Sequence, residues 1–219
     1  MPNVIKAFND SAGIYDDWYG QPMGEQVFTA ELRGLQKLLP PEGLGADLGA
    51  GTGIFAEQLT TAQRVIVCVD PSPKMLAQAA ERGLMAILGV GEAFPFRRNV
   101  LDFTFLVAVL EFIREPEEVL QSIKGALKAG GAIVTLTINR DSPWGEMYRE
   151  LAGKGDPIFR HAHMYGPDEV ESMLVCSSYS VEESLGTLTN PPHMDEIGVN
   201  LVPADPEAGV VLFKGLKKG

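Results

Sequence analysis

The segment ADLGAGTG, residues 46–53, carries the strongest chemical signal in this 219-residue chain. Gly49, Gly51 and Gly53 join a short apolar run to a helical pattern. Glycine tolerates positive φ and lets a ligand approach the backbone closely. The start of a helix adds unpaired N–H groups and the positive end of the helix dipole. Such a loop can hold a carboxylate, a phosphate or the edge of a ribose.

Two acidic residues accompany this loop. Asp47 precedes the glycines, and Asp70 ends the apolar run RVIVCVD, where it can accept two hydrogen bonds from a ribose diol. Gly51-x-Gly53-x-x-Ala56 followed by Asp70 also satisfies the dinucleotide fingerprint, so a nicotinamide or flavin oxidoreductase is one alternative. A carboxylate at Asp47 would repel a pyrophosphate and attract an ammonium or sulfonium group. The pair therefore favours a cationic cofactor.

The hydrophobic pattern places these residues in an α/β fold. Strands that are apolar on both faces alternate with amphipathic helices, which implies a parallel sheet covered on both sides, in a single domain over residues 1–219. The predicted helices are 26–39, 54–60, 73–83, 116–130 and 167–174, and the predicted strands are 43–49, 64–70, 85–90, 101–110, 132–139, 180–188 and 209–216.

Composition excludes several classes of function. Lys and Arg number 18 against 29 Asp and Glu, a net charge of −11, which disfavours a nucleic-acid partner. Cys68 and Cys176 are too few for a disulfide scaffold and form no zinc motif. The longest apolar stretch, residues 103–110, is too short to span a bilayer, and no signal peptide is visible. We expect a soluble cytoplasmic protein with no metal, and the sequence leaves its oligomeric state open.

Five motifs in order carry a family resemblance: DLGAGTG, VIVCVDPSPKML, GEAFPF, LDFTFLVAVLEFI and LKAGGAIVTLTIN. Over residues 28–140 the chain resembles the class I S-adenosylmethionine (SAM)-dependent methyltransferases, and most of all their small-molecule branch, which includes quinone-biosynthesis enzymes. The resemblance implies a doubly wound, seven-stranded, mostly parallel sheet of the Rossmann-like methyltransferase fold, whose last strand is antiparallel. It also implies SAM as cofactor and S-adenosylhomocysteine as product. We expect residues 1–25 to form an N-terminal helical lid and residues 140–165, an insertion after the fifth strand, to cover the substrate.

The same resemblance assigns the cofactor contacts. Asp47 and the glycine-loop backbone face the methionine part, Asp70 takes the ribose hydroxyls, and the segment from Pro71 to Met75 packs near the adenine. Val90 stands where the family usually carries the Asp that holds the adenine amino group, so that either the backbone of Gly91 and Glu92 serves instead or the affinity for adenine is reduced. The predicted cofactor-binding residues are Asp47, Gly49, Ala50, Gly51, Gly53, Asp70, Pro71, Met75, Gly91, Glu92, Tyr15 and Tyr19, the two tyrosines through aromatic contact with the sulfonium.

Direct displacement at a sulfonium methyl mainly requires alignment and exclusion of water. A general base is needed only for a hydroxyl, a carbon acid or a protonated amine. Glu111, which follows the fourth predicted strand, and the pair His161 and His163 are the candidate catalytic residues. A non-catalytic SAM-binding or SAM-sensing module is the other alternative.

Overall fold

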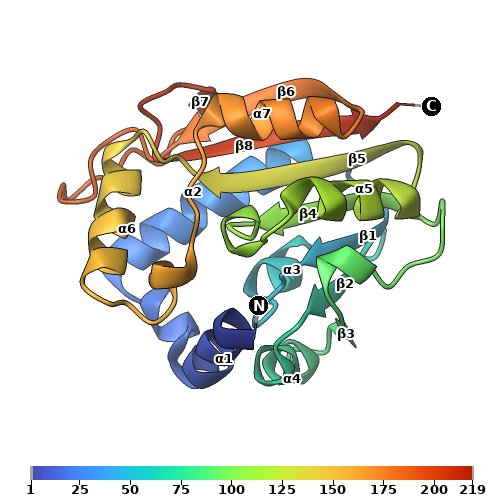
Figure 1. The fold of residues 1–219 in the computed structure, drawn as a ribbon, viewed down its shortest axis with the longest axis horizontal. Coiled ribbons are helices and arrows are strands. Elements are labelled where there is room, and N and C mark those ends of the chain that lie inside the picture. The colour runs from blue at the N-terminus through green and yellow to red at the C-terminus, as the bar shows by residue number, and fades with distance from the viewer. Residues whose placement is uncertain (1, 219) are drawn as a thin grey trace.

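One sheet organises the computed structural model, which describes residues 2–218 (Figure 1). Its strands are β1 (Gly43–Leu48), β2 (Arg64–Asp70), β3 (Met85–Leu88), β4 (Leu101–Val107), β5 (Leu127–Ile138), β6 (Tyr179–Thr187), β7 (Val202–Pro203) and β8 (Val210–Lys217). They lie in the order β3-β2-β1-β4-β5-β8-β6-β7. Neighbours among the first five strands are parallel, whereas β8 is antiparallel to β5 and β6. The strand order therefore reverses between β1 and β4, which is where open α/β sheets bind ligands.

The sheet has one strand more than the seven expected. The two-residue β7 pairs with β6 through Leu185 and Gly186, inside a Pro-rich loop with no alternating pattern of its own. A strand this short is held by its partner and leaves no periodic signal in the sequence.

Helix boundaries differ from the expectation at several places. The helix expected over 26–39 is α2 (Pro22–Leu38), and α6 (Pro143–Gly153) was not predicted as a helix. The helix expected over 116–130 is α5 (Pro116–Ala126), and β5 begins at Leu127. Leu127 pairs with Leu101 of β4, so ladder hydrogen bonding replaces helical bonding three residues before Gly130.

Helices cover both faces of the sheet (Figure 1). The helices α2 (Pro22–Leu38), α3 (Ile54–Leu59) and α4 (Pro73–Glu81) contribute to one hydrophobic cluster, and α5 and α7 (Pro167–Cys176) contribute to a second. The helix α4 begins as its sequence predicts, with the Ser72 hydroxyl accepting from the Met75 N–H and Pro73 at the first helical position. The two clusters hold the carboxyl ends of the parallel strands in a fixed register.

Two further segments gather at the edge toward which β5 points (Figure 1). The N-terminal one consists of α1 (Pro2–Ser11) and the 3₁₀ turns Ala12–Ile14 and Asp16–Trp18, and the other contains α6 (Pro143–Gly153) and the 3₁₀ turn Phe159–His161. They correspond to the two regions that the sequence analysis expected to act as covers. No helix within residues 2–218 is both long enough and apolar enough to cross a membrane.

Candidate active site

The loop between β1 and α3 is built on three left-handed glycines. Gly49, Gly51 and Gly53 have φ values of 72°, 55° and 78°. A Cβ at Gly49 would lie 2.4 Å from a methyl of Val109, and one at Gly53 would lie 2.6 Å from a methyl of Leu84, whereas one at Gly51 would meet nothing within 4 Å. The outer two glycines therefore allow close packing, and Gly51 opens toward free space.

Asp70, the last residue of β2, clamps this loop. Its Oδ2 accepts a hydrogen bond from the Gly51 N–H at 2.9 Å, and its Oδ1 accepts one from the Ser72 N–H at 2.7 Å. The side chain is buried, which raises the pKa of Asp70, while the two N–H donors act in the opposite direction. Because each carboxylate oxygen has a second lone pair, Asp70 can still accept hydrogen bonds from a diol.

Asp47, near the end of β1, is an isolated buried acid. It is 2% exposed, and no residue within 2–218 donates a hydrogen bond to its carboxylate. Burial raises the pKa of Asp47 well above its usual range, and the nearby Asp70 adds to this effect. An unpaired buried carboxylate is costly. The site is therefore complementary to a cationic group.

A cavity of about 630 Å³ extends from the glycine loop across the carboxyl ends of β1 and β4. Gly53 and Met75 lie outside its lining, since Gly53 packs on Leu84 and Met75 is fully buried. One carboxylate oxygen of Glu92, Oε1, is buried without a hydrogen-bond partner among residues 2–218. The predicted cofactor residues that line the cavity are Tyr15, Tyr19, Asp47, Gly49, Ala50, Gly51, Asp70, Pro71, Gly91 and Glu92.

Aromatic rings connect the two covering segments above this cavity. The Phe8 ring of α1 contacts Phe112 with centroids 5.2 Å apart, and Phe112 contacts Phe159 at 6.4 Å. Phe159 lies 4.3 Å from Tyr148 of α6. The N-terminal segment and residues 140–165 thus meet through a continuous series of aromatic contacts.

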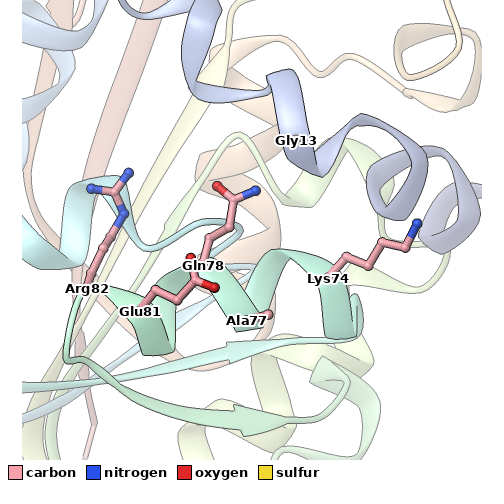
Figure 2. A pocket seen from close by; sticks show the side chains of 6 residues that line it. All are labelled: Gly13, Lys74, Ala77, Gln78, Glu81 and Arg82. Carbon is pink, nitrogen blue, oxygen red and sulfur yellow. The ribbon is translucent and has the colours of Figure 1, made fainter.

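Polar contacts fix the N-terminal segment to the glycine loop and to α4. The Thr52 hydroxyl donates to Asp16 at 2.7 Å, and Arg82 bonds both Asp16 and the Thr52 carbonyl. Gln78 donates to the Ala12 carbonyl. Figure 2 shows the open depression beside this seam, whose side chains come mainly from α4: Gly13, Lys74, Ala77, Gln78, Glu81 and Arg82.

The three candidate bases lie outside the cavity lining. Glu111 is 1% exposed, and its Oε1 accepts from the Ile138 N–H at 2.8 Å. Burial raises the pKa of Glu111 to about 7. The Glu111 carbonyl accepts from the His163 N–H at 2.7 Å, so the backbones of these two residues meet, but His163 is exposed and His161 is partly so. No three His, Cys, Asp or Glu side chains of the described chain are grouped to hold a metal ion.

Glu31 is a cavity residue that the sequence analysis missed. It lies on α2, is 6% exposed and lines the same cavity. Its position was marked in the sequence, because Glu31 is four residues from both Val27 and Leu35 and therefore falls on the apolar stripe of the helix. A charged residue on the apolar face of a helix is buried when that face packs, which makes it a candidate site residue.

Known proteins share both this fold and this loop. Residues 46–135 match the methyltransferase domain family. A crystal structure from Thermotoga maritima, described as a SAM-dependent methyltransferase and possible histamine N-methyltransferase, superposes with a TM-score of 0.88 and 26% identity, over 98% of this chain and 100% of that one. The chain belongs to the class I SAM-dependent methyltransferases.

SAM is accordingly the cofactor of this methyltransferase. Two uncharacterised relatives extend the similarity beyond the matched domain. A Methanocaldococcus jannaschii protein is 33% identical over 170 residues, which are 78% of this methyltransferase and 79% of the relative. A Mycobacterium tuberculosis protein is 32% identical over 193 residues, which are 88% of this chain and 66% of the relative's own length.

The residues present fit the cofactor. Asp47 offers an unpartnered carboxylate to an ammonium group, and Asp70 offers two oxygens to a ribose diol. Gly51 leaves the space that a Cβ would occupy, and Glu92, which lines the same cavity, has a buried oxygen without a partner among residues 2–218. A nicotinamide or flavin dinucleotide would instead bring a pyrophosphate beside Asp47, which the buried carboxylate opposes.

Proposed function

We propose that the protein transfers the methyl group of SAM to a small-molecule acceptor by direct displacement. The observation that carries this proposal is the pair of buried carboxylates on the glycine loop, with Asp47 unpartnered and Asp70 bonded to Gly51. When bound, SAM supplies a methyl group already activated on a positively charged sulfur.

The chain's own residues bind and orient in this proposal. Asp47 holds the ammonium end of the cofactor, and Asp70 holds the ribose hydroxyls while it keeps Gly51 in place. Glu92 accepts a hydrogen bond from the adenine edge through its unpaired Oε1, which compensates for Val90. The remaining predicted contacts, made by Tyr15, Tyr19 and the loop backbone, complete the cofactor side.

The acceptor side supports a small molecule. Residues of α1 and α6 line the cavity, and Phe112 contacts both Phe8 of α1 and Phe159 of the turn after α6, which favours a compact acceptor over a polymer. The net charge of −11 opposes nucleic acid as an acceptor. The Thermotoga maritima neighbour, named as a possible histamine N-methyltransferase, is consistent with this class. Cys68 and Cys176 are free thiols, which suits a cytoplasmic site of action.

Calorimetry with S-adenosylhomocysteine and with NAD tests the cofactor assignment first. We expect S-adenosylhomocysteine to bind and NAD not to bind. Transfer of an isotopically labelled methyl group from SAM to a panel of small amines, phenols and thiols then tests the activity. Tighter binding of NAD would refute the proposal, and cofactor binding without transfer to any acceptor class would favour the SAM-sensing alternative.

A further inference from the structure

Glu31 is the buried acid of the cavity that the cofactor contacts do not use. Apart from Tyr15 and Tyr19 of the N-terminal segment, the cofactor residues lie at the ends of β1 and β2 and on the loop after β3. Glu31 instead lies on α2, which packs against β5, β6 and β8. Burial raises the pKa of Glu31, and the charge of Glu111, whose carboxylate bonds Ile138 at the end of β5, adds to this effect. Burial also raises the pKa of Tyr148 in α6, with Glu31 as the second cause. In the sheet order, β5 lies on the opposite side of β1 from β2 and β3. Glu31 therefore belongs to the half of the cavity left for the acceptor.

Its carboxylate has no partner within residues 2–218. Burial raises the pKa of Glu31 to about 8, with Glu111 as the second cause, and no hydrogen bond lowers it. Asp156, the other acid on this side, differs because its Oδ1 already accepts from the Ile158 and Phe159 N–H groups at 2.9 Å each. A buried acid without a partner destabilises the free protein. Its presence in the cavity therefore points to a ligand that supplies the missing hydrogen bond or counter-charge.

The residues that line the cavity indicate which charge that ligand carries. Within the part of the chain that the structure describes, no Lys, Arg or His lines the cavity. Tyr15, Tyr19 and Tyr148 line the same cavity, and their pKa values are raised first by burial and in addition by the charge of Glu31. Aromatic faces together with an unpaired carboxylate form a site for an ammonium group, whereas an anionic acceptor would find no counter-charge.

We propose that Glu31 binds the ammonium group of a small amine acceptor and takes one proton from it. The inference rests on the proposed function and names its acceptor class. In this step one N–H bond of the ammonium breaks and an O–H bond forms on Glu31. The nitrogen keeps the electron pair, so that a neutral amine faces the methyl donor. The groups that face this exchange are Tyr15 and Tyr19 of the N-terminal segment, Tyr148 of α6 and Glu111 after β4.

Binding measurements on the full chain saturated with S-adenosylhomocysteine test this inference without relying on turnover. The probes are benzylamine, 2-phenylethylamine and butylamine, each compared with the alcohol and the carboxylate of the same skeleton. We expect at least one amine to bind at least about 10-fold more tightly than its alcohol near pH 7.5, because a charged hydrogen bond outweighs a neutral one. The carboxylates should not bind.

Glu31→Gln should abolish the preference for the amine while leaving affinity for S-adenosylhomocysteine within about 2-fold of the parent. Glu25→Gln is the matched control, because Glu25 is exposed on the same helix, and it should keep the preference. The inference is overturned if no amine outcompetes its alcohol on the parent protein, or if Glu31→Gln retains the preference. Should S-adenosylhomocysteine itself fail to bind, the proposed function fails instead, so the two failures are distinguishable.

Discussion

The Asp70 carboxylate and the Gly51 N–H, joined at 2.9 Å, link the end of β2 to the centre of the glycine loop. A single carboxylate thus shapes the loop and presents oxygens to the ribose. The sequence indicated only the second of these roles. Because the two roles share one group, a substitution at Asp70 acts on both.

Asp70→Ala should bind S-adenosylhomocysteine roughly 100-fold more weakly than the parent. The loss of two charge-assisted hydrogen bonds to the ribose supplies most of this effect, and water recovers part of it. Asp70→Asn should fall between the two, because an amide keeps one acceptor oxygen. Calorimetry gives the affinities, with Asp195→Ala as a control at an exposed position. Parent-like affinity in folded Asp70→Ala would contradict the ribose assignment.

Gly51→Val should lose cofactor binding, because its side chain would enter the space beside the loop at a φ of 55°. Gly83→Val is a matched control, since Gly83 has a φ of 79°, equally open surroundings and a position outside the cavity. Both variants should lose about 1–2 kcal/mol of stability from the left-handed backbone. Only Gly51→Val should fail to bind S-adenosylhomocysteine in calorimetry, and normal binding by this variant would exclude the loop as the site.

The sequence predicted the sheet and the left-handed glycine loop well because both leave local signals. Buried parallel strands are continuous apolar runs, and a left-handed turn such as the one at Gly51 requires glycine. The acid at the end of β2 followed from its place after such a run. These features depend on neighbours in the chain and can be read without knowing the fold.

The proposed acceptor side of the cavity was harder to predict because it is assembled from distant segments. Glu31, Tyr148 and Phe159 meet only after α2 and the insertion have packed at the same sheet edge. Proximity in the sequence to a strand end indicated Glu111 as a base, yet its side chain turns to the Ile138 N–H of β5. The catalytic roles of Glu111, His161 and His163 remain predictions.

Asp16→Ala should loosen the N-terminal cover and weaken S-adenosylhomocysteine binding by about 3- to 10-fold, since it removes the contacts of Asp16 with Thr52 and Arg82. Glu57→Gln is the control, because it removes another Arg82 contact without touching the N-terminal segment. Calorimetry measures the affinity of each variant for S-adenosylhomocysteine. Equal affinities in the two variants would show that the contacts of Asp16 with Thr52 and Arg82 do not contribute to cofactor binding.

Hydrogen exchange tests whether the two covers respond to the ligand. On addition of S-adenosylhomocysteine, amides in residues 2–20 and 140–165 should exchange more slowly, as in lids that close over a bound ligand. Amides of β5 serve as the internal control and should change little, because that strand is buried between β4 and β8. Unchanged exchange in both covers would argue against a lid.

Stability should depend on pH through Glu31. The pKa of Glu31 is about 8 in the folded protein and close to the ordinary 4.5 when the chain unfolds. Between these values the folded state holds a proton that the unfolded state has released, so the free energy of unfolding falls as pH rises through this window and levels off above it.

Glu31→Gln removes this contribution and should gain stability relative to the parent, by a few kcal/mol near pH 8 and by little near pH 5. Denaturant unfolding of the parent and of Glu31→Gln at several pH values measures the difference between their free energies of unfolding. Contributions that both proteins share, such as that of Glu111, largely cancel in this difference. Glu25→Gln, at an exposed position of the same helix, is the control variant. A difference for Glu31→Gln that does not change with pH would mean that the carboxylate is not desolvated in the cavity.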